Sequence, residues 1–269
     1  MTSASILEAI EASKRLFDRG DIDSAMRILD PYHGERAADL QRGSVAAHAV
    51  ALDGRSAADA VMILTPHLDE PRGLDLVGLS HYHAAITDQT GTLSEAVGEC
   101  TTASRSDFSD PCWEADNTLH IGMIQQAQGS YDIAEAYLHA AHRTAEGCPT
   151  QRAFTAFHLG MDARARGDDA AALTLFEESL DIRRSIEVWL PTSLIAVAET
   201  LRGSRPQQAI KLIDEAVDVA RALRVRRPLA LALRARGTLE QRPADLEEAL
   251  ELAEVLGDLT LSGSLRRTP

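Results

Sequence analysis

Aromatic residues, cysteines and long apolar runs are scarce in this sequence. Aromatic residues make up only 4% of the 269 positions, which disfavours a β-sandwich, whereas abundant alanine and leucine suit helices that pack through small side chains. No run of about 18 apolar residues is present, so a membrane-spanning helix is not expected. The N-terminus also lacks the basic segment and apolar stretch of a secretory leader. We therefore expect a soluble protein that is not exported.

Lysine and net positive charge are also lacking. The formal net charge is −14, and Lys14 and Lys211 are the only lysines. Phosphate backbones are bound by basic faces, so we expect no direct contact with nucleic acid. A cluster of arginines over residues 221–236 is the exception. The acidic segment 247–254 follows it, which favours ion pairs within the chain over a docking surface.

The three cysteines are Cys100, Cys112 and Cys148. They include no C-x-x-C pair and are too few for a disulfide scaffold. We therefore predict three small buried thiols and a location in the reducing cytoplasm.

A recurring helical hairpin is the dominant pattern that is present. In its clearest copy, residues 167–180, a glycine ends one helix, an acidic residue starts the next, and a buried-type alanine follows five residues after the glycine. Small residues twelve positions before this alanine, such as Gly122 and Gly160, are predicted to lie where the two helices of a hairpin cross. Copies recur every 35 to 40 residues, a period typical of stacked units. The anchor alanines are Ala25, Ala60, Ala96, Ala134, Ala172, Ala209 and Ala249, and the helix breaks before them are Gly20, Gly54, Gly91, Gly129, Gly167, Ser204 and Ala244.

This periodicity predicts an all-α fold, a single solenoid of about seven antiparallel hairpins over residues 1–256. A C-terminal tail, 257–269, is expected to fray, and the acidic helix before it is expected to cap the array. In the seventh unit, Gly237 predicts an interruption of the first helix. The expected units are 3–34, 35–70, 72–106, 111–147, 150–187, 189–224 and 227–256.

The hairpins resemble the tetratricopeptide repeat (TPR). The resemblance rests on Leu159-Gly160 in a first helix, followed by Gly-Asp, the anchor alanine and an apolar i, i+4 stripe, and it extends over about residues 3–256. The repeats are longer than the roughly 34-residue consensus. Ser80, Thr118 and Ala156 stand where that consensus has a large aromatic residue.

The longer repeats are similar to the sensor arms of bacterial signal-dependent transcription regulators, in which other domains bind ATP and DNA. The resemblance implies a right-handed superhelical solenoid whose first helices line a concave groove. At the groove positions this sequence is apolar in the middle of the chain, as expected of a ligand or peptide site. The site predicted from these positions consists of Leu119, Met123, Gln126, Phe154, Phe157, Met161, Arg164, His81 and Asp88. A second interpretation stays open, because in a tightly coiled array Phe154, Phe157 and Met161 would simply be core.

Catalytic and metal-binding motifs are absent from the sequence. No P-loop, dinucleotide-binding fingerprint, nucleophile elbow or H-E-x-x-H is present, so we predict a protein that is not an enzyme and that uses no cofactor. His81 and His83 would point to different sides of a helix. His139 and His142 share a face but have no carboxylate or cysteine at ligand spacing, so no metal site is expected.

The function predicted from these observations is that of a non-enzymatic, cytoplasmic scaffold with a regulatory or sensing role. Its groove would bind a peptide, a protein segment or a small apolar ligand, without direct contact to nucleic acid or membrane. Two alternatives stay open: a homodimeric or larger assembly module with no groove ligand, and an unrecognised enzyme using His81, His120, His158 and Asp88 on the inner wall.

Overall fold

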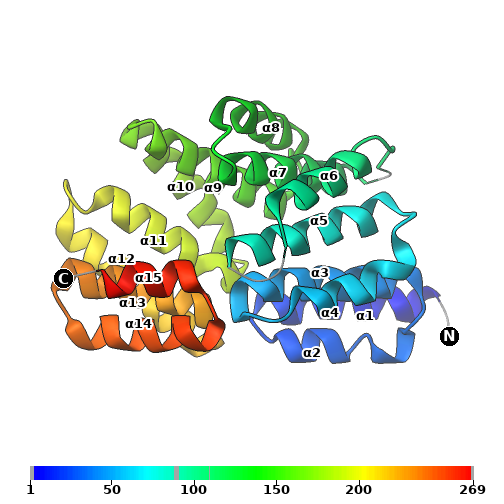
Figure 1. Ribbon diagram of the computed structural model, residues 1–269, viewed down its shortest axis with the longest axis horizontal. Helices are drawn as coiled ribbons and strands as arrows, with labels where there is room; N and C mark the ends of the chain where they lie inside the picture. Colours follow the sequence, from blue (N-terminus) through cyan, green and yellow to red (C-terminus); the bar gives the residue numbers. More distant parts are fainter. Residues whose placement is uncertain (1–2, 88–90, 109, 268–269) are drawn as a thin grey trace.

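The computed structural model of the protein describes residues 3–87, 91–108 and 110–267. Within these ranges the chain forms fifteen α-helices and three short 3-10 helices, with no β-strand. Successive α-helices pair as antiparallel hairpins, and one hairpin stacks on the next (Figure 1). In chain order the elements are α1 (Ser3–Asp18), α2 (Ile22–Arg27), η1 (Asp30–Tyr32), α3 (Arg36–Asp53), α4 (Ala57–Leu64), η2 (Thr65–His67), α5 (Pro71–Ile86), α6 (Leu93–Ala103), α7 (Pro111–Ala127), α8 (Tyr131–Thr144), α9 (Pro149–Ala165), α10 (Asp169–Arg183), η3 (Glu187–Trp189), α11 (Leu190–Leu201), α12 (Pro206–Leu223), α13 (Arg226–Glu240), α14 (Pro243–Leu256) and α15 (Leu259–Arg266).

Small residues set the distance between the helices of a hairpin. All seven anchor alanines are completely buried. At the crossing of α7 and α8, a Cβ added to Gly122 would lie 2.9 Å from Cδ2 of Leu138. At the crossing of α9 and α10, a Cβ added to Gly160 would lie 2.7 Å from the ring of Phe176. Any larger residue would push the paired helices apart, so the predicted role of the small residues at these crossings is confirmed.

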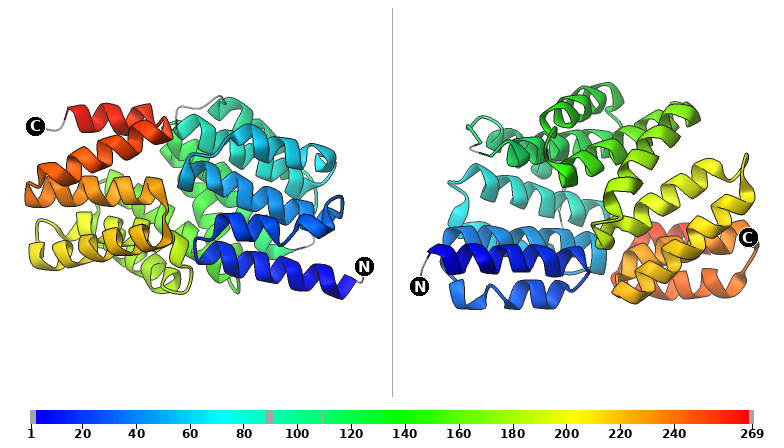
Figure 2. Two further views of the ribbon diagram at one scale, coloured as in Figure 1. Left: turned by 90° about the horizontal axis from the view of Figure 1, so that it is seen from below. Right: turned by 180° about the vertical axis from the view of Figure 1, so that it is seen from behind.

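The two ends of the array lie side by side. In Figure 1 the blue helices α1–α4 and the orange and red helices α13–α15 meet beneath the green hairpins, and Figure 2 shows the same neighbourhood from two other sides. Helix α13 packs on α3, and Gly54 lies against Leu256. Nε of Arg226 is 3.4 Å from Oδ1 of Asp53. The solenoid therefore coils back on itself, and its inner wall encloses a space.

The seventh hairpin differs from the expectation at two positions. Helix α13 passes through Gly237 without interruption. The glycine instead allows α14 to approach closely, because an added Cβ would lie 2.8 Å from Cδ2 of Leu246. The break before the last anchor alanine lies at Gln241, which has a positive φ of 55°. Ala244, where the break was expected, is inside α14.

The C-terminal segment was expected to fray, but most of it forms α15. The Asp258 side chain caps this helix by accepting a hydrogen bond from the Leu261 backbone N–H. Leu261 and Leu265 are buried against the apolar core. Helix α15 therefore covers the seventh hairpin, a role that we had expected the acidic helix before it to fill alone.

Two of the three cysteines form a disulfide, which corrects the expectation of three free thiols. Cys112, near the start of α7, is bonded to Cys148, which precedes α9 and lies 36 positions further along the chain. That separation is about one repeat, so stacking brings the starts of successive first helices together. The Cα–Cα distance is 5.6 Å. Cys100 is the free, buried cysteine, as predicted.

The arginine cluster over residues 221–236 forms ion pairs within the chain. Arg221 pairs with Glu248 at 2.6 Å, and Arg236 pairs with Asp245 at 2.6 Å. These contacts agree with the predicted intramolecular pairing. In the part of the chain that the structure describes, no helix is both long enough and apolar enough to cross a membrane.

Candidate functional site

A cavity of about 600 Å³ lies inside the coil. All seven first helices, α1, α3, α5, α7, α9, α11 and α13, contribute side chains to its wall. Arg183 at the end of α10, Trp189 of η3, and Asp110 and Ile186 just before α7 and η3 also line it. The wall therefore combines residues that are far apart in the sequence and that meet only because the coil returns to its start.

Most of the predicted site residues lie on this wall. Gln126 does not, because its side chain bonds to the backbone and the ring of His158. His81 does not either, since its Nδ1 lies 2.8 Å from Oε2 of Glu99 on α6. Asp88 lies outside the described residues. The predicted residues that line the cavity are Leu119, Met123, Phe154, Phe157, Met161 and Arg164.

An aromatic cluster on α9 joins distant parts of the wall. The ring centroid of Phe154 is 5.1 Å from that of Trp189 and 6.5 Å from that of His48 on α3. Phe157 packs on Phe176 at 5.7 Å. Phe154 and Phe157 are half-buried, so they pack sideways against their neighbours while also facing the cavity. The groove interpretation thus describes the side of these rings that faces the cavity, and the core interpretation describes the side that packs against neighbouring residues.

Arg183 is buried beside these rings and has no carboxylate partner among the described residues. Its side chain is 2% exposed. Its guanidinium carbon lies 4.4 Å from the ring centroid of Phe154 and 4.7 Å from that of Phe157. Nη1 donates hydrogen bonds to Thr192 Oγ1 at 2.9 Å and Ser193 Oγ at 3.1 Å. Burial lowers the pKa of Arg183 to about 9, so the group is still a cation at neutral pH.

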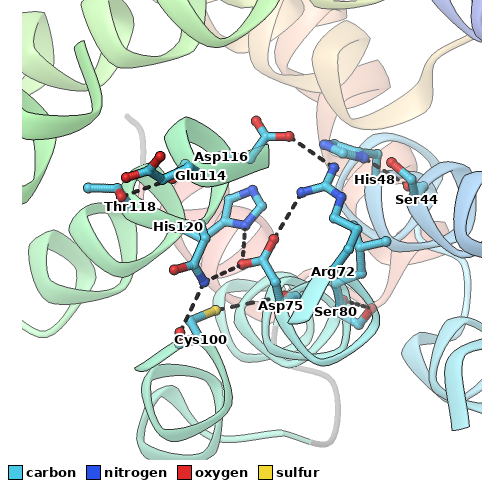
Figure 3. A network of polar contacts seen from close by, with 12 residues as sticks. Ser44, His48, Arg72, Asp75, Ser80, Cys100, Glu114, Asp116, Thr118 and His120 are labelled. Carbon is cyan, nitrogen blue, oxygen red and sulfur yellow. Dashed lines mark hydrogen bonds and ion pairs between the residues drawn. The ribbon is translucent and has the colours of Figure 1, made fainter. Parts of the chain in front are cut away.

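A second buried arginine, Arg72, belongs to a fully paired network (Figure 3). Its Nη1 lies 2.9 Å from Oδ2 of Asp75, and its Nη2 lies 2.9 Å from Oδ2 of Asp116. His120 Nδ1 and Asn117 Nδ2 each donate to Asp75 Oδ1 at 2.9 Å. Burial acts to raise the pKa of Asp75, but the charge and hydrogen bond of His120, the charge of Arg72 and the hydrogen bond from Asn117 outweigh it and lower that pKa.

The polar atoms of Asp75, Cys100 and His120 lie within 4.8 Å of one another, a distance that would suit a metal ion. Both carboxylate oxygens of Asp75 are already used by Arg72, Asn117 and His120. A divalent cation there would lie beside the Arg72 guanidinium, whose charge would repel it. The cluster is therefore better explained as a hydrogen-bonded framework.

The histidines considered for catalysis have separate partners. His120 is held by Asp75, and His158 Nδ1 donates to Gln126 Oε1 at 3.0 Å. Burial, followed by the charges of Arg183 and His120, lowers the pKa of His158 to about 3. No hydrogen bond or ion pair links His81, His120 and His158 to one another within the described ranges, although His120 and His158 both line the cavity.

The charge of the wall is opposite in sign to that of the whole chain. Six cationic side chains and four carboxylates line the described cavity, although the chain as a whole carries −14. Burial lowers the pKa of His48 to about 4, so this histidine is neutral at pH 7. The cationic members are Lys14, Arg72, Arg164, Arg183, Arg227 and Arg234, and the acidic members are Asp18, Asp110, Asp116 and Glu199.

Comparison with known proteins agrees with this architecture. Residues 114–185 match the family model described as tetratricopeptide repeat, and no curated protein sequence matches the chain. A Signal Transduction ATPase with Numerous Domains (STAND) protein with a tetratricopeptide repeat sensor, from Pyrococcus horikoshii, is 14% identical with a TM-score of 0.61; the match covers 93% of this chain and 41% of that one. A tetratricopeptide repeat protein from Parabacteroides merdae is 15% identical with a TM-score of 0.53, and the match covers 98% of this chain and 100% of that one. BtubC from P. vanneervenii is 12% identical with a TM-score of 0.52, and the match covers 86% of this chain and 93% of that one.

These likenesses concern the fold, and the chain spans less than half the length of the STAND protein. The family match lies in the fourth and fifth hairpins, which carry most of the residues predicted for the site. Residues 114–185 therefore match the tetratricopeptide repeat family, and the chain as a whole has the all-helical solenoid fold seen in tetratricopeptide repeat proteins.

Proposed function

We propose that this chain is a ligand-binding repeat scaffold whose central cavity takes a small amphipathic molecule or a short apolar peptide segment. The observation that carries the proposal is the closed coil, because it brings all seven first helices around one cavity of about 600 Å³. That volume lies within the range of about 300–1,000 Å³ found for small-molecule sites.

The composition of the wall supports an apolar ligand body. Leu119 and Met123 on α7 face the same space as Phe157 and Met161 on α9. Methionine side chains adapt to ligands of different shape, and aromatic side chains bury much apolar area. A few polar groups among them would orient the ligand, as in other small-molecule sites.

The closed coil also supports a sensing role. A ligand that touched α1 or α3 and α9 at once would stabilise the closed form, because each hairpin otherwise contacts mainly its neighbours. The STAND protein is described as carrying a tetratricopeptide repeat sensor, and its fold is similar to that of this chain. We infer a sensing module that would transmit ligand binding as a change in the contact between its ends.

A neutral fluorescent probe, N-phenyl-1-naphthylamine, tests the cavity directly. We expect the wild-type protein to bind it in a saturable manner. Phe157→Ala and Met161→Ala should each weaken binding about tenfold, which corresponds to a loss of roughly 1.4 kcal/mol of apolar contact. Met62, which is 69% exposed, supplies the matched control, and Met62→Ala should bind as the wild type does.

Two results would contradict the proposal. One is the absence of probe uptake by a folded wild-type protein, and the other is equal uptake by the wild type and both cavity variants. A homodimer found by light scattering together with no uptake would favour assembly without a cavity ligand.

The cytoplasmic location is part of the same proposal, and the bond between Cys112 and Cys148 is an argument against it. Disulfides persist mainly in oxidising compartments. Alkylating thiols in intact source cells, completing the alkylation in denaturant without reductant so that buried Cys100 also reacts, and then measuring the mass of the protein decides the point. Three blocked cysteines would indicate a reducing compartment, and one would indicate the bridged form.

A further inference from the structure

Arg183 presents hydrogen-bond donors that no residue of the described chain uses. Its Nε is buried without a partner, and Nη2 has no acceptor either, since the two hydrogen bonds of the group leave from Nη1. A guanidinium carries five N–H donors, so three of them are unmatched. Arg183 is also part of the cavity wall. A buried cation with unused donors therefore faces the space in which we propose that a ligand binds.

The neighbours of Arg183 do not need it as a partner. Ser193 Oγ also lies 3.0 Å from Ser179 Oγ, and Thr192 Oγ1 donates to the Trp189 carbonyl at 2.8 Å. Both hydroxyls would stay hydrogen-bonded if the guanidinium were removed. The framework is thus complete without this charge.

The compensation available to the charge within the protein is partial. The electron-rich faces of Phe154 and Phe157 attract the cation, the more so because it is desolvated. Arg183 also ends α10, where the helix dipole supplies the equivalent of roughly half a negative charge. Removing a cation from water carries a large desolvation penalty even after relaxation, so a full counter-charge would still be favourable.

Most of the other cations on the wall already have carboxylate partners. Arg72 pairs with Asp75 and Asp116, and Arg164 Nη1 lies 2.8 Å from Glu199 Oε2. Lys14 and Arg227 form ion pairs with Glu11 and Asp258. Arg234 has no ion pair within the described ranges, but it is only half-buried and reaches Ser264 Oγ at 3.5 Å. Arg183 is therefore the most buried cation of the wall that lacks a counter-charge.

We propose that the cavity binds an organic carboxylate with an apolar body, whose carboxylate accepts hydrogen bonds from Arg183 and whose body lies against Phe157, Met161 and Met123. This inference rests on the proposed function and specifies the ligand class. A monoanion would neutralise the most buried cation of the wall that lacks a counter-charge among the described residues, whereas a neutral ligand would leave that charge uncompensated. The carboxylate could belong to a free small acid or to the C-terminus of an apolar peptide.

Matched acid and amide probes test the inference by isothermal titration calorimetry. The first pair is 1-naphthaleneacetate and 1-naphthaleneacetamide, and the second is N-acetyl-Leu-Phe with a free or an amidated C-terminus. We expect the wild type to bind the acid of at least one pair about tenfold or more tightly than its amide. The pair with the larger preference identifies the source of the carboxylate.

Three variants locate the preference. Arg183→Met should reduce it to less than twofold, and Arg183→Lys, which keeps the charge, should retain part of it. The neighbouring Arg184 is the control, because its side chain is 49% exposed and pairs with Glu215. Arg184→Met should therefore keep the full preference.

The naphthylamine probe separates failure of this inference from failure of the proposed function. Uptake of that neutral probe without any preference for a carboxylate, or a preference that survives in Arg183→Met, would overturn the anion site and leave the cavity function standing. No uptake of any probe by folded protein would overturn both.

Discussion

Two buried arginines face the same cavity with opposite electrostatic surroundings. Arg72, at the start of α5, is 9% exposed and bonds to two carboxylates. Arg183, at the end of α10, is 2% exposed and has two hydroxyl acceptors and two aromatic faces. The charge of Arg72 is matched by carboxylates, and the charge of Arg183 has no carboxylate partner in the part of the chain that the structure describes.

The difference separates framework from function. A buried ion pair contributes rigidity, and removing one partner leaves the other charge stranded. A buried charge without a partner costs stability in the free protein and gains from an incoming anion. We therefore assign Arg72 to the architecture and Arg183 to recognition, and the following predictions test that contrast in order of expected effect.

Removing the centre of the paired network should have the largest effect. Asp75→Ala would leave Arg72, His120 and Asn117 without their shared acceptor. We expect a loss of about 3–5 kcal/mol in the free energy of unfolding, measured by urea denaturation. Asp132→Ala, at a side chain that is 99% exposed, should change it by less than about 0.5 kcal/mol. Equal effects of both variants would contradict a framework role for the network.

Removing the disulfide should have the next largest effect, because it ties α7, which carries His120, to α9, which carries Phe154 and Phe157. The bond closes a loop with a sequence separation of 36. The double variant Cys112→Ala and Cys148→Ala should lose about 3–4 kcal/mol from the entropy of loop closure. A reductant should destabilise the wild type similarly and leave the double variant unchanged. Insensitivity of the wild type to reductant would mean that the thiols are not bridged.

Acid should destabilise the protein through His158, which feels the charges of both Arg183 and His120. The pKa of His158 in the folded state is about 3, below the ordinary 6.5. Between these two pH values the unfolded chain binds a proton at His158 and the folded chain does not. Stability is therefore fully present above about pH 6.5 and falls as the pH drops toward 3. Between pH 7 and 4.5 we expect a loss of about 2–3 kcal/mol from this residue.

The variant His158→Gln should lack this contribution, so its free energy of unfolding should fall by about 2–3 kcal/mol less than that of the wild type between pH 7 and 4.5. His139→Gln, at an exposed position on α8, serves as the control and should leave the slope unchanged. If the free energy of unfolding depends on pH equally in the wild type and both variants, the acid sensitivity lies elsewhere, for example at His48, whose pKa is also lowered by burial.

Removing the unpaired arginine should have the smallest effect on stability. Arg183→Met keeps much of the apolar stem, eliminates a buried charge and leaves Thr192 and Ser193 with other hydrogen-bond partners. We expect the free energy of unfolding to change by less than about 1 kcal/mol or to rise. A loss above about 2 kcal/mol would show that Arg183 is framework, as Arg72 is.

Sequence periodicity predicted those wall residues whose direction follows from their position in the repeat. Phe157 and Met161 follow this rule and line the cavity. Arg183 could not be found by it, because it ends a second helix and is directed inward by the aromatic rings of α9. Asp75 was missed for a related reason, since its partners His120 and Asn117 are more than forty residues away in the chain.

The sequence by itself determined the hairpins, because glycine breaks, capping residues and small-residue crossings act between neighbours in the chain. The seven buried alanines follow from this local chemistry. Only the tertiary structure decided the curvature that brings α13 onto α3, the bond between Cys112 and Cys148, and the placement of Arg183 on the cavity wall. Small rotations between hairpins add up along a solenoid, and no single repeat encodes their sum.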